Sequence, residues 1–192
     1  NLINFGIGFS EYFGSRDSSG LNISDNKVTG KTLFVLDTDF ASHVMIADNK
    51  GQIGIVSLDS NGIETIDLTT VDKTRTYKEM HFSDTPIEIL DKTKSSSFAV
   101  EMALDAGRII TAADSLGASQ AMLNKAVEYS KERKQFNRVI GSFQAVKHMC
   151  AEMAAELEPC YSLVWHAAHC FDDSSEDARL MACLAKSHIS EV

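Results

Sequence analysis

The fold of this chain is decided by a connection between two helical patterns, Glu132-Arg133-Lys134-Gln135-Phe136-Asn137-Arg138-Val139-Ile140-Gly141-Ser142-Phe143-Gln144-Ala145-Val146-Lys147-His148. Apolar residues recur at helical spacing on both sides of it. Before it these are Leu104, Ile109, Ala112, Ala113, Leu116, Met122, Leu123 and Val127, and after it Val146, Met149, Met153, Leu157, Leu163 and Val164. Because so short a connection suits adjacent antiparallel helices, we predict a helical hairpin.

Two residues of the connection are suited to ending one helix and beginning the next. Asn137 is, after Gly, the residue best suited to the left-handed conformation that ends a helix. Ser142 can cap the following helix through its hydroxyl group. The predicted bend therefore brings Arg133 and Gln144 close to the free amides of a helical first turn, and such amides attract anions.

The second half of the chain has the pattern of long helices. One of the serines at 95–97 is expected to cap a first helix that runs to about Phe136, on the order of forty residues or ~60 Å. Its stripe of Ala, Leu, Ile and Met suits a four-helix bundle. We expect Pro159 to interrupt and kink the second helix. Ser174-Ser175-Glu176-Asp177 is expected to open a third helix with acids in its first turn.

The first half of the chain has the pattern of strands and turns. β-rich runs occur at 32–36, 44–47, 53–58, 63–68 and 79–82, and turn signals separate them at 25–26, 48–51 and 59–62. The step from Thr85 to Pro86 should end the last strand, because Pro cannot continue a ladder of hydrogen bonds. The predicted class is α+β. A small antiparallel β-barrel or sandwich domain over residues 1–92 precedes an incomplete up-and-down helical bundle domain over residues 93–192.

The composition is that of an ordinary soluble protein and argues against some partners. The 192 residues are 44% hydrophobic and 23% charged, with a formal net charge of −9. Nucleic acid is not expected as the main partner, because neutralising its phosphates needs clustered Lys and Arg. No apolar run is long enough to span a membrane, and no signal peptide opens the sequence. Since the sequence begins at Asn1 within a strand-like segment, we expect it to be part of a longer protein.

None of the four cysteines belongs to a CxxC pair: Cys150, Cys160, Cys170 and Cys183. Disulfide scaffolds are small and loop-rich, so we expect reduced thiols and a cytoplasmic location. His166, His169 and Cys170 converge on one helical face and could suggest a metal, but no fourth ligand has a convincing spacing. We therefore expect packing there rather than a metal site.

The connecting stretch resembles the acyl-CoA dehydrogenase family of flavoproteins. In that family an R-x-x-F-G segment ends one helix, and an I-x-x-F-Q segment opens the next. The matching residues here are Arg133, Phe136, Ile140, Phe143 and Gln144. Asn137 replaces the glycine and keeps the backbone conformation expected there. The resemblance extends over the whole chain, weakly over residues 1–90 and closely from Ala103 onward.

This resemblance implies a cofactor and an assembly. The cofactor would be FAD, and the hairpin would bind the dinucleotide of a neighbouring subunit. The residues implied for that contact are Arg133, Gln135, Phe136, Phe143 and Gln144. The protein would then be a homo-oligomer, a dimer or tetramer, or a heteromer with a related subunit. In the alternative interpretation the stretch is a structural hairpin with an incidental Arg and Gln, and its two phenylalanines are core residues.

The resemblance also implies that the first half contacts the flavin ring. Ser10-Glu11-Tyr12-Phe13-Gly14-Ser15-Arg16-Asp17 stands where the family has T-E-P-x-A-G-S-D, and Gly30 precedes an aromatic run, Phe34-Val35-Leu36. The implied flavin contacts are Ser10, Ser15, Phe34 and Leu36. Leu36 replaces a hydroxyl residue that, in the family, hydrogen-bonds the flavin near its reactive nitrogen. On residue chemistry alone these are ordinary loop residues.

Asp105 and Arg108 form a charged pair within an apolar stretch of the first helix. Residues at i and i+3 lie on one helical face, and the simplest interpretation is a surface salt bridge that contributes little. In the family, a D-x-x-R pair at this point holds the acyl-CoA substrate. The resemblance therefore implies substrate binding by Asp105 and Arg108, with Gly107 leaving room for the acyl chain.

The activity implied by the resemblance is FAD-dependent α,β-dehydrogenation of an acyl-CoA thioester, as in β-oxidation of a fatty acid or a sterol side chain. An electron-transfer flavoprotein would accept the electrons. The reaction needs a carboxylate to remove the α proton. In most of the family this is a glutamate on a later helix, which would lie beyond Val192, and in a minority it lies where this chain has Gly107. No catalytic residue is therefore assigned within the sequence.

Two other functions remain open. A non-catalytic partner subunit of a heteromeric dehydrogenase would keep the fold and lose the flavin contacts, which suits Leu36. A flavin oxidase or monooxygenase acting on another substrate would share the fold, but the Asp105–Arg108 pair argues for a CoA ester.

Overall fold

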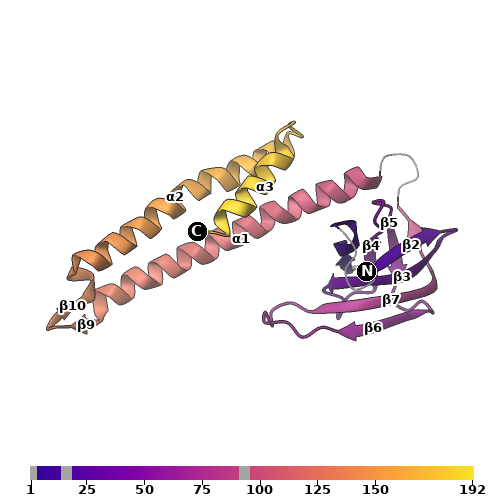
Figure 1. The fold of residues 1–192 in the computed structure, drawn as a ribbon, viewed down its shortest axis with the longest axis horizontal. Coiled ribbons are helices and arrows are strands. Elements are labelled where there is room, and N and C mark those ends of the chain that lie inside the picture. The colour runs from indigo at the N-terminus through magenta and orange to yellow at the C-terminus, as the bar shows by residue number, and fades with distance from the viewer. Residues whose placement is uncertain (1–3, 14–18, 91–95) are drawn as a thin grey trace. The chain divides into compact units, whose positions relative to one another are not determined.

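The computed structural model describes residues 4–13, 19–90 and 96–192. The chain divides into two compact units, Asn1–Glu101 and Met102–Val192 (Figure 1). The first contains the strands of a mixed sheet, and the second contains helices. The predicted α+β class is therefore confirmed.

The first unit is built on one sheet of eight strands. They are β1 (Phe5–Gly8), β2 (Gly20–Ser24), β3 (Lys27–Leu36), β4 (His43–Ala47), β5 (Ile53–Ser57), β6 (Ile63–Asp67), β7 (Tyr77–Pro86) and β8 (Glu88–Ile89). A 3₁₀ turn, η1 (Ser10–Phe13), follows β1. The strands are hydrogen-bonded in the order β6-β7-β3-β1-β4-β5-β8. Strand β2 pairs with residues 27–31 of β3, whereas β1 pairs with β3 at Leu36.

The sheet departs from the predicted antiparallel barrel or sandwich in two respects. Its path of hydrogen-bonded strands has two ends, β6 and β8, so the sheet is not a closed barrel. One pair is also parallel, because β1 lies between β3 and β4, antiparallel to the first and parallel to the second. The remaining pairs are antiparallel, as predicted.

The expected strands at 32–36, 44–47, 53–58, 63–68 and 79–82 lie within or overlap β3, β4, β5, β6 and β7. The turns expected at 25–26 and 48–51 contain residues with positive φ angles. Asp25 and Asn26 have φ angles of 53° and 57° between β2 and β3, and Gly51 has a φ angle of 82°. Strand β7 ends at Pro86, but a further short strand, β8, follows it.

Alternating side chains of the central strands form the core of the first unit. Val28, Val35, Val44, Ile46 and Met80 are fully buried there. They come from β3, β4 and β7, so the core holds the middle of the sheet together. Burial of such side chains from water is the main source of stability in a unit of this size.

The helical unit contains α1 (Ser96–Glu132), α2 (Gln144–Asp172) and α3 (Ala178–Ile189), although α1 begins within the first unit. Helices α1 and α2 run antiparallel, and α3 lies beside them (Figure 1). Ala112, Ala167, Ala182 and Ala185 are fully buried between them. Such small side chains allow helices to approach closely. Among the described residues, no helix is both long and apolar enough to cross a membrane.

Several predicted helix boundaries need correction. Helix α1 ends at Glu132, before Phe136, because a β-hairpin follows it. Helix α2 continues through Pro159 as a single helix. The acids expected in the first turn of α3 precede it, and Asp177 occupies the N-cap position without a side-chain cap. The serine at 95, one of the residues expected to cap α1, lies outside the described residues.

Candidate functional site

A β-hairpin joins α1 to α2 at the end of the helical unit. Strands β9 (Lys134–Gln135) and β10 (Arg138–Val139) pair antiparallel, with Gln135 opposite Arg138. Phe136 and Asn137 form the turn, with φ angles of 52° and 61°. Positive φ at both central residues is the requirement of a type I′ hairpin turn. Asn137 is thus left-handed as predicted, but it reverses a β-hairpin rather than ending a helix.

Backbone contacts fix the hairpin to the end of α1. The amide of Ile140 donates to the carbonyl of Arg133 at 2.8 Å. Gly141 faces Ser130 so closely that a Cβ atom at Gly141 would lie 2.8 Å from the Ser130 carbonyl oxygen. A side chain at this position would therefore force the two backbones apart.

Ser142 does not cap α2, contrary to the prediction. It ends the 3₁₀ turn η2 (Ile140–Ser142), and its hydroxyl donates to the carbonyl of Val139 at 2.7 Å. The N-cap residue of α2 is Phe143, which has no side-chain cap. The local 3₁₀ turn shifts the start of the helix by one residue beyond the serine.

An aromatic cluster lies at this helix start. The Arg138 guanidinium carbon is 4.0 Å from the centroid of the Phe143 ring. The Phe136 ring meets Phe143 edge to face, with the centroids 6.1 Å apart and an interplanar angle of 82°. Gln144 approaches His148 one turn later, with 3.2 Å between their Nε2 atoms. The structure thus brings together Phe136, Phe143 and Gln144, as the sequence predicted, and adds Arg138, which it did not.

The other predicted hairpin residues are exposed. Arg133 immediately follows α1 and Gln135 lies on β9, and both side chains face water. Within the described part of the chain, no carboxylate forms an ion pair with Arg133. The guanidinium group at this position is therefore available to an anionic ligand.

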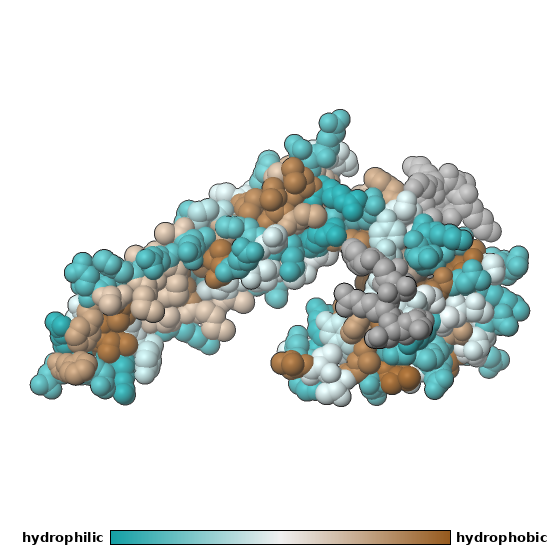
Figure 2. All heavy atoms as spheres, viewed as in Figure 1, coloured by the Kyte–Doolittle hydropathy of each residue, from teal (hydrophilic) through white to brown (hydrophobic). Residues whose placement is uncertain are grey.

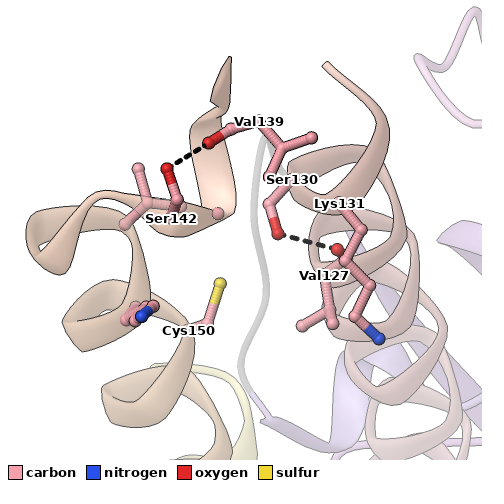
Figure 3. Close-up of a pocket in the computed structure, with 9 residues that line it drawn as sticks. Val127, Ser130, Lys131, Val139, Ser142 and Cys150 are labelled. Atoms are coloured by element: carbon pink, nitrogen blue, oxygen red, sulfur yellow. Dashed lines mark hydrogen bonds between the residues drawn. The ribbon is translucent and has the colours of Figure 1, made fainter. Parts of the chain in front are cut away.

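A cavity of about 520 Å³ opens behind the hairpin, between the end of α1 and the start of α2 (Figure 3). Its residues are Val127, Ser130, Lys131, Val139, Gly141, Ser142, Val146, Lys147 and Cys150. The Cys150 sulfur points into the space, whereas the hydroxyls of Ser130 and Ser142 are held by the carbonyls of Val127 and Val139 (Figure 3). The wall is mainly apolar.

Asp105 and Arg108 form an ion pair on α1. The Asp105 residue is buried and the Arg108 side chain is 25% exposed, so this pair is not the surface salt bridge of the simplest interpretation. Gly107 is exposed, and a Cβ atom there would meet nothing within 4 Å. Arg133 lies 25 residues after Arg108 in the chain (133 minus 108), and nearly all the residues between them belong to α1. That is roughly 35–40 Å at 1.5 Å per residue, so these residues form two separate groups.

The predicted flavin contacts belong to the first unit. Phe34 is 48% exposed and has a φ angle of 56°, at an irregularity of β3 between Thr32 and Val35. The Ser10 hydroxyl donates to the carbonyl of Leu33 at 2.5 Å, beside this irregularity. Leu36 ends β3, and Ser15 lies outside the described residues. A positive φ angle is unusual for an aromatic residue and marks local strain, which clusters at functional sites.

The cysteines and histidines of α2 offer no metal site within the described residues. Cys170 approaches His166, with Sγ 3.5 Å from Nε2, but His169 stacks edge to face on Trp165 instead. All four cysteines are free thiols. Burial raises the pKa of the Cys160 thiol, which suits a packing role rather than a reactive one.

The sequence profile of the acyl-CoA dehydrogenase C-terminal domain matches residues 98–192. Over 186 residues the chain is 33% identical to a 3-(aryl)acrylate reductase of Clostridium sporogenes, covering 90% of this chain and 45% of that protein. Over 89 residues it is 43% identical to the caffeyl-CoA reductase–Etf complex subunit CarC of Acetobacterium woodii, covering 46% of this chain and 23% of that protein.

The fold is also that of a solved acyl-CoA dehydrogenase. The butyryl-CoA dehydrogenase of Megasphaera elsdenii superposes with a TM-score of 0.83 at 24% identity, covering 97% of this chain and 54% of that one. The chain therefore spans less than half the length of the two curated relatives above and about half of the solved structure.

The first prediction concerns the Asp105–Arg108 pair. Replacing Arg108 with Ala leaves the buried Asp105 carboxylate uncompensated, which costs about 3–5 kcal/mol in fully buried pairs. Because Arg108 is partly exposed, we expect a loss of unfolding free energy near the lower end of that range. Urea unfolding of the full-length protein measures it, with the exposed Lys125→Ala on the same helix as control. Equal stability of the Arg108→Ala and Lys125→Ala proteins would contradict a structural role for the pair.

Proposed function

Because the chain belongs to the acyl-CoA dehydrogenase family, we propose that the full-length protein is an FAD-dependent oxidoreductase acting on the α,β carbon–carbon bond of an acyl-CoA thioester. The observation that carries the proposal is the hairpin. It presents an exposed guanidinium group that forms no ion pair with the described residues, and aromatic rings beside a helix start that has no side-chain cap.

The chemistry of the hairpin fits a dinucleotide. A guanidinium group binds pyrophosphate through paired, charge-assisted hydrogen bonds. Arg133 would supply this group, while the side-chain amides of Gln135 and Gln144 would add neutral donors. Phe136 and Phe143 would provide ring surface. We propose that these residues bind the dinucleotide of a neighbouring subunit.

The first unit fits the flavin ring less completely. Phe34 presents an exposed ring, and Ser10 and Ser15 are the further residues proposed to lie near it. Leu36 has no donor for a flavin nitrogen. Thr38, two residues later, does have a hydroxyl, but its Oγ1 atom is buried and has no partner among the described residues. When bound, FAD would supply the hydride acceptor for the substrate's β carbon.

Asp105, Arg108 and Gly107 are proposed to bind the acyl-CoA substrate. The Arg108 side chain is 25% exposed, while Asp105 pairs with its guanidinium group. The open space at Gly107 leaves the helix surface accessible to an acyl chain. The proposed substrates are fatty acyl or sterol side-chain thioesters of lipid β-oxidation. Both relatives described above are named as reductases or subunits of one.

The proposed reaction also requires partners. We propose an electron-transfer flavoprotein as electron acceptor, which the Etf complex named for the A. woodii relative supports. The four free thiols support the proposed cytoplasmic location. The carboxylate base is proposed to lie outside residues 1–192, because the position beside Arg108 is Gly107.

A second function is favoured by one observation. Leu36 removes the hydroxyl that would bond the flavin near its reactive nitrogen. A non-catalytic partner subunit in a heteromeric dehydrogenase would tolerate this change. Such a subunit would keep the hairpin contact to a neighbour's dinucleotide without running the reaction itself.

The surface of the helical unit supports an oligomer, proposed to be a homodimer, a homotetramer or a heteromer. Figure 2 shows apolar atoms at its α2–α3 end, with smaller groups along the helices. Large apolar side chains exposed on α1, α2 and α3 include Ile110, Met122, Met149, Trp165 and Leu180. An interface between subunits would cover such side chains.

A second prediction tests the hairpin. Arg133→Ala should lower FAD affinity by about 1.5–3 kcal/mol, the usual contribution of a hydrogen bond to a charged group. Arg133→Lys should recover only part of this, because an ammonium cannot bind in a bidentate way. Titration of the full-length apoprotein with FAD measures both, and Lys131→Ala, which removes an exposed charge from the end of α1, is the control. Unchanged affinity in Arg133→Ala protein would remove the hairpin from the cofactor site.

A third prediction separates substrate binding from stability. The double variant Asp105→Asn/Arg108→Ala removes both charges, so it should recover much of the stability that Arg108→Ala loses. If Arg108 binds the ligand, this double variant should still bind an acyl-CoA at least tenfold more weakly than wild type, as expected for a lost charge-assisted hydrogen bond. Flavin absorbance during an acyl-CoA titration reports the binding. Wild-type affinity would confine the pair to a structural role.

A fourth prediction concerns assembly. Since the hairpin is proposed to bind a neighbour's dinucleotide, the full-length protein should be at least dimeric whenever it holds FAD. Light scattering coupled to size-exclusion chromatography measures the mass. A stable monomer with full flavin occupancy would contradict the arrangement.

A further inference from the structure

Arg138 belongs to none of the groups of residues assigned so far, yet it makes a specific contact at the hairpin. Its guanidinium lies over the face of Phe143, 4.0 Å from the ring centroid, while Phe136 meets the same ring edge-on. Arg138 is exposed and, within the described residues, forms no ion pair. Among the described residues, the contact of this guanidinium group with the Phe143 ring therefore has no ion pair beside it.

Burial does not explain why Phe136 stays in the cluster. Phe136 is 87% exposed, whereas Phe143 is partly buried. Phe136 also adopts a φ angle of 52°, which costs energy for a bulky residue at a position where Asn or Gly is preferred. A strained, exposed aromatic residue persists when contacts around it hold it, and such strain clusters at functional sites.

We propose that Arg138 is a positioning residue for dinucleotide binding, acting through Phe143. This inference rests on the proposed binding of FAD at the hairpin. The guanidinium covers one face of the Phe143 ring and restrains its rotation, and the restrained ring in turn gives the edge of Phe136 a fixed partner. Both rings then remain at the start of α2, next to Gln144, before any ligand arrives.

The contact favours arginine over lysine for a geometric reason. A planar guanidinium stacks flat on a ring, whereas an ammonium makes only a point contact. Preorganised rings cost less to order when a ligand binds, so affinity rises without any new contact to the ligand. Arg138 therefore differs from Arg133, which is proposed to bind the phosphates directly.

The test is a set of FAD titrations on full-length apoprotein. Arg138→Ala and Arg138→Gln should each weaken binding about three- to tenfold, the range of cation–π contacts, and Arg138→Lys should weaken it less. Lys134→Ala is the matched control, since it removes one exposed positive charge from the facing strand of the same hairpin. It should change affinity less than twofold. Equal effects of Arg138→Ala and Lys134→Ala would overturn the inference, because only general charge would then matter.

A double-mutant cycle with Phe143→Leu distinguishes positioning from direct binding. If Arg138 acts through the ring, Arg138→Ala should have less than a twofold effect in the Phe143→Leu background. A full effect in that background would mean that Arg138 binds the ligand itself, and the inference would fall.

Fluorine NMR of 4-fluorophenylalanine at position 143 gives a readout that needs no cofactor. In the apoprotein, Arg138→Ala should move this resonance towards its unfolded value, Arg138→Lys should move it less, and Lys134→Ala should leave it in place. An unmoved resonance in Arg138→Ala protein would overturn the inference even if that variant bound FAD poorly. A wild-type protein that binds no FAD would instead refute the proposed function, whereas equal FAD affinity of wild-type and Arg138→Ala proteins would refute only this inference.

Discussion

The close approach of Gly141 to Ser130 determines how the hairpin of β9 and β10 is attached to the end of α1. With only 2.8 Å between the Ser130 carbonyl oxygen and the place of a Cβ atom at Gly141, the turn η2 lies against the backbone of α1. Ser130 is buried, and its hydroxyl is turned back to the carbonyl of Val127. Strands β9 and β10 therefore project beyond the helices. The turn residues between them, Phe136 and Asn137, are exposed.

The class of fold and much of the candidate site could be predicted from the sequence, because they depend on periodicity and on local residue chemistry. The helices and the longer strands have clear repeats. The start of the sequence was predicted to be strand-like, but the bounds of β1, Phe5-Gly6-Ile7-Gly8, were not predicted, since glycine alternates there with the apolar residues and gives the segment a low strand propensity. The predicted barrel failed for a related reason, because the parallel pairing of β1 with β4 depends on residues far apart in the chain.

At the hairpin, the local residue chemistry allows two structures, and the predicted helix end at Asn137 is wrong. Asn137 suits both the end of a helix and a type I′ turn. What separates them is the conformation of Phe136, and an aromatic side chain gives no hint of a positive φ angle. The burial of Asp105 could not be predicted either. A spacing of i and i+3 places two residues on one helical face but does not determine whether that face is exposed to water. Arg138 was missed because its partner, Phe143, lies across an intervening 3₁₀ turn.

The central position of β1 has a consequence for the order in which the first unit can form. In the path of hydrogen-bonded strands, its four residues connect the group β6-β7-β3 to the group β4-β5-β8. Strand β1 precedes both of its neighbours in the chain, so one of its edges finds a partner only when β3 has been made, and the other only after β4. Strand β1 is nevertheless the first strand of the sheet to be paired at both edges, because β3 and β4 each need a further strand that is made later, β7 and β5.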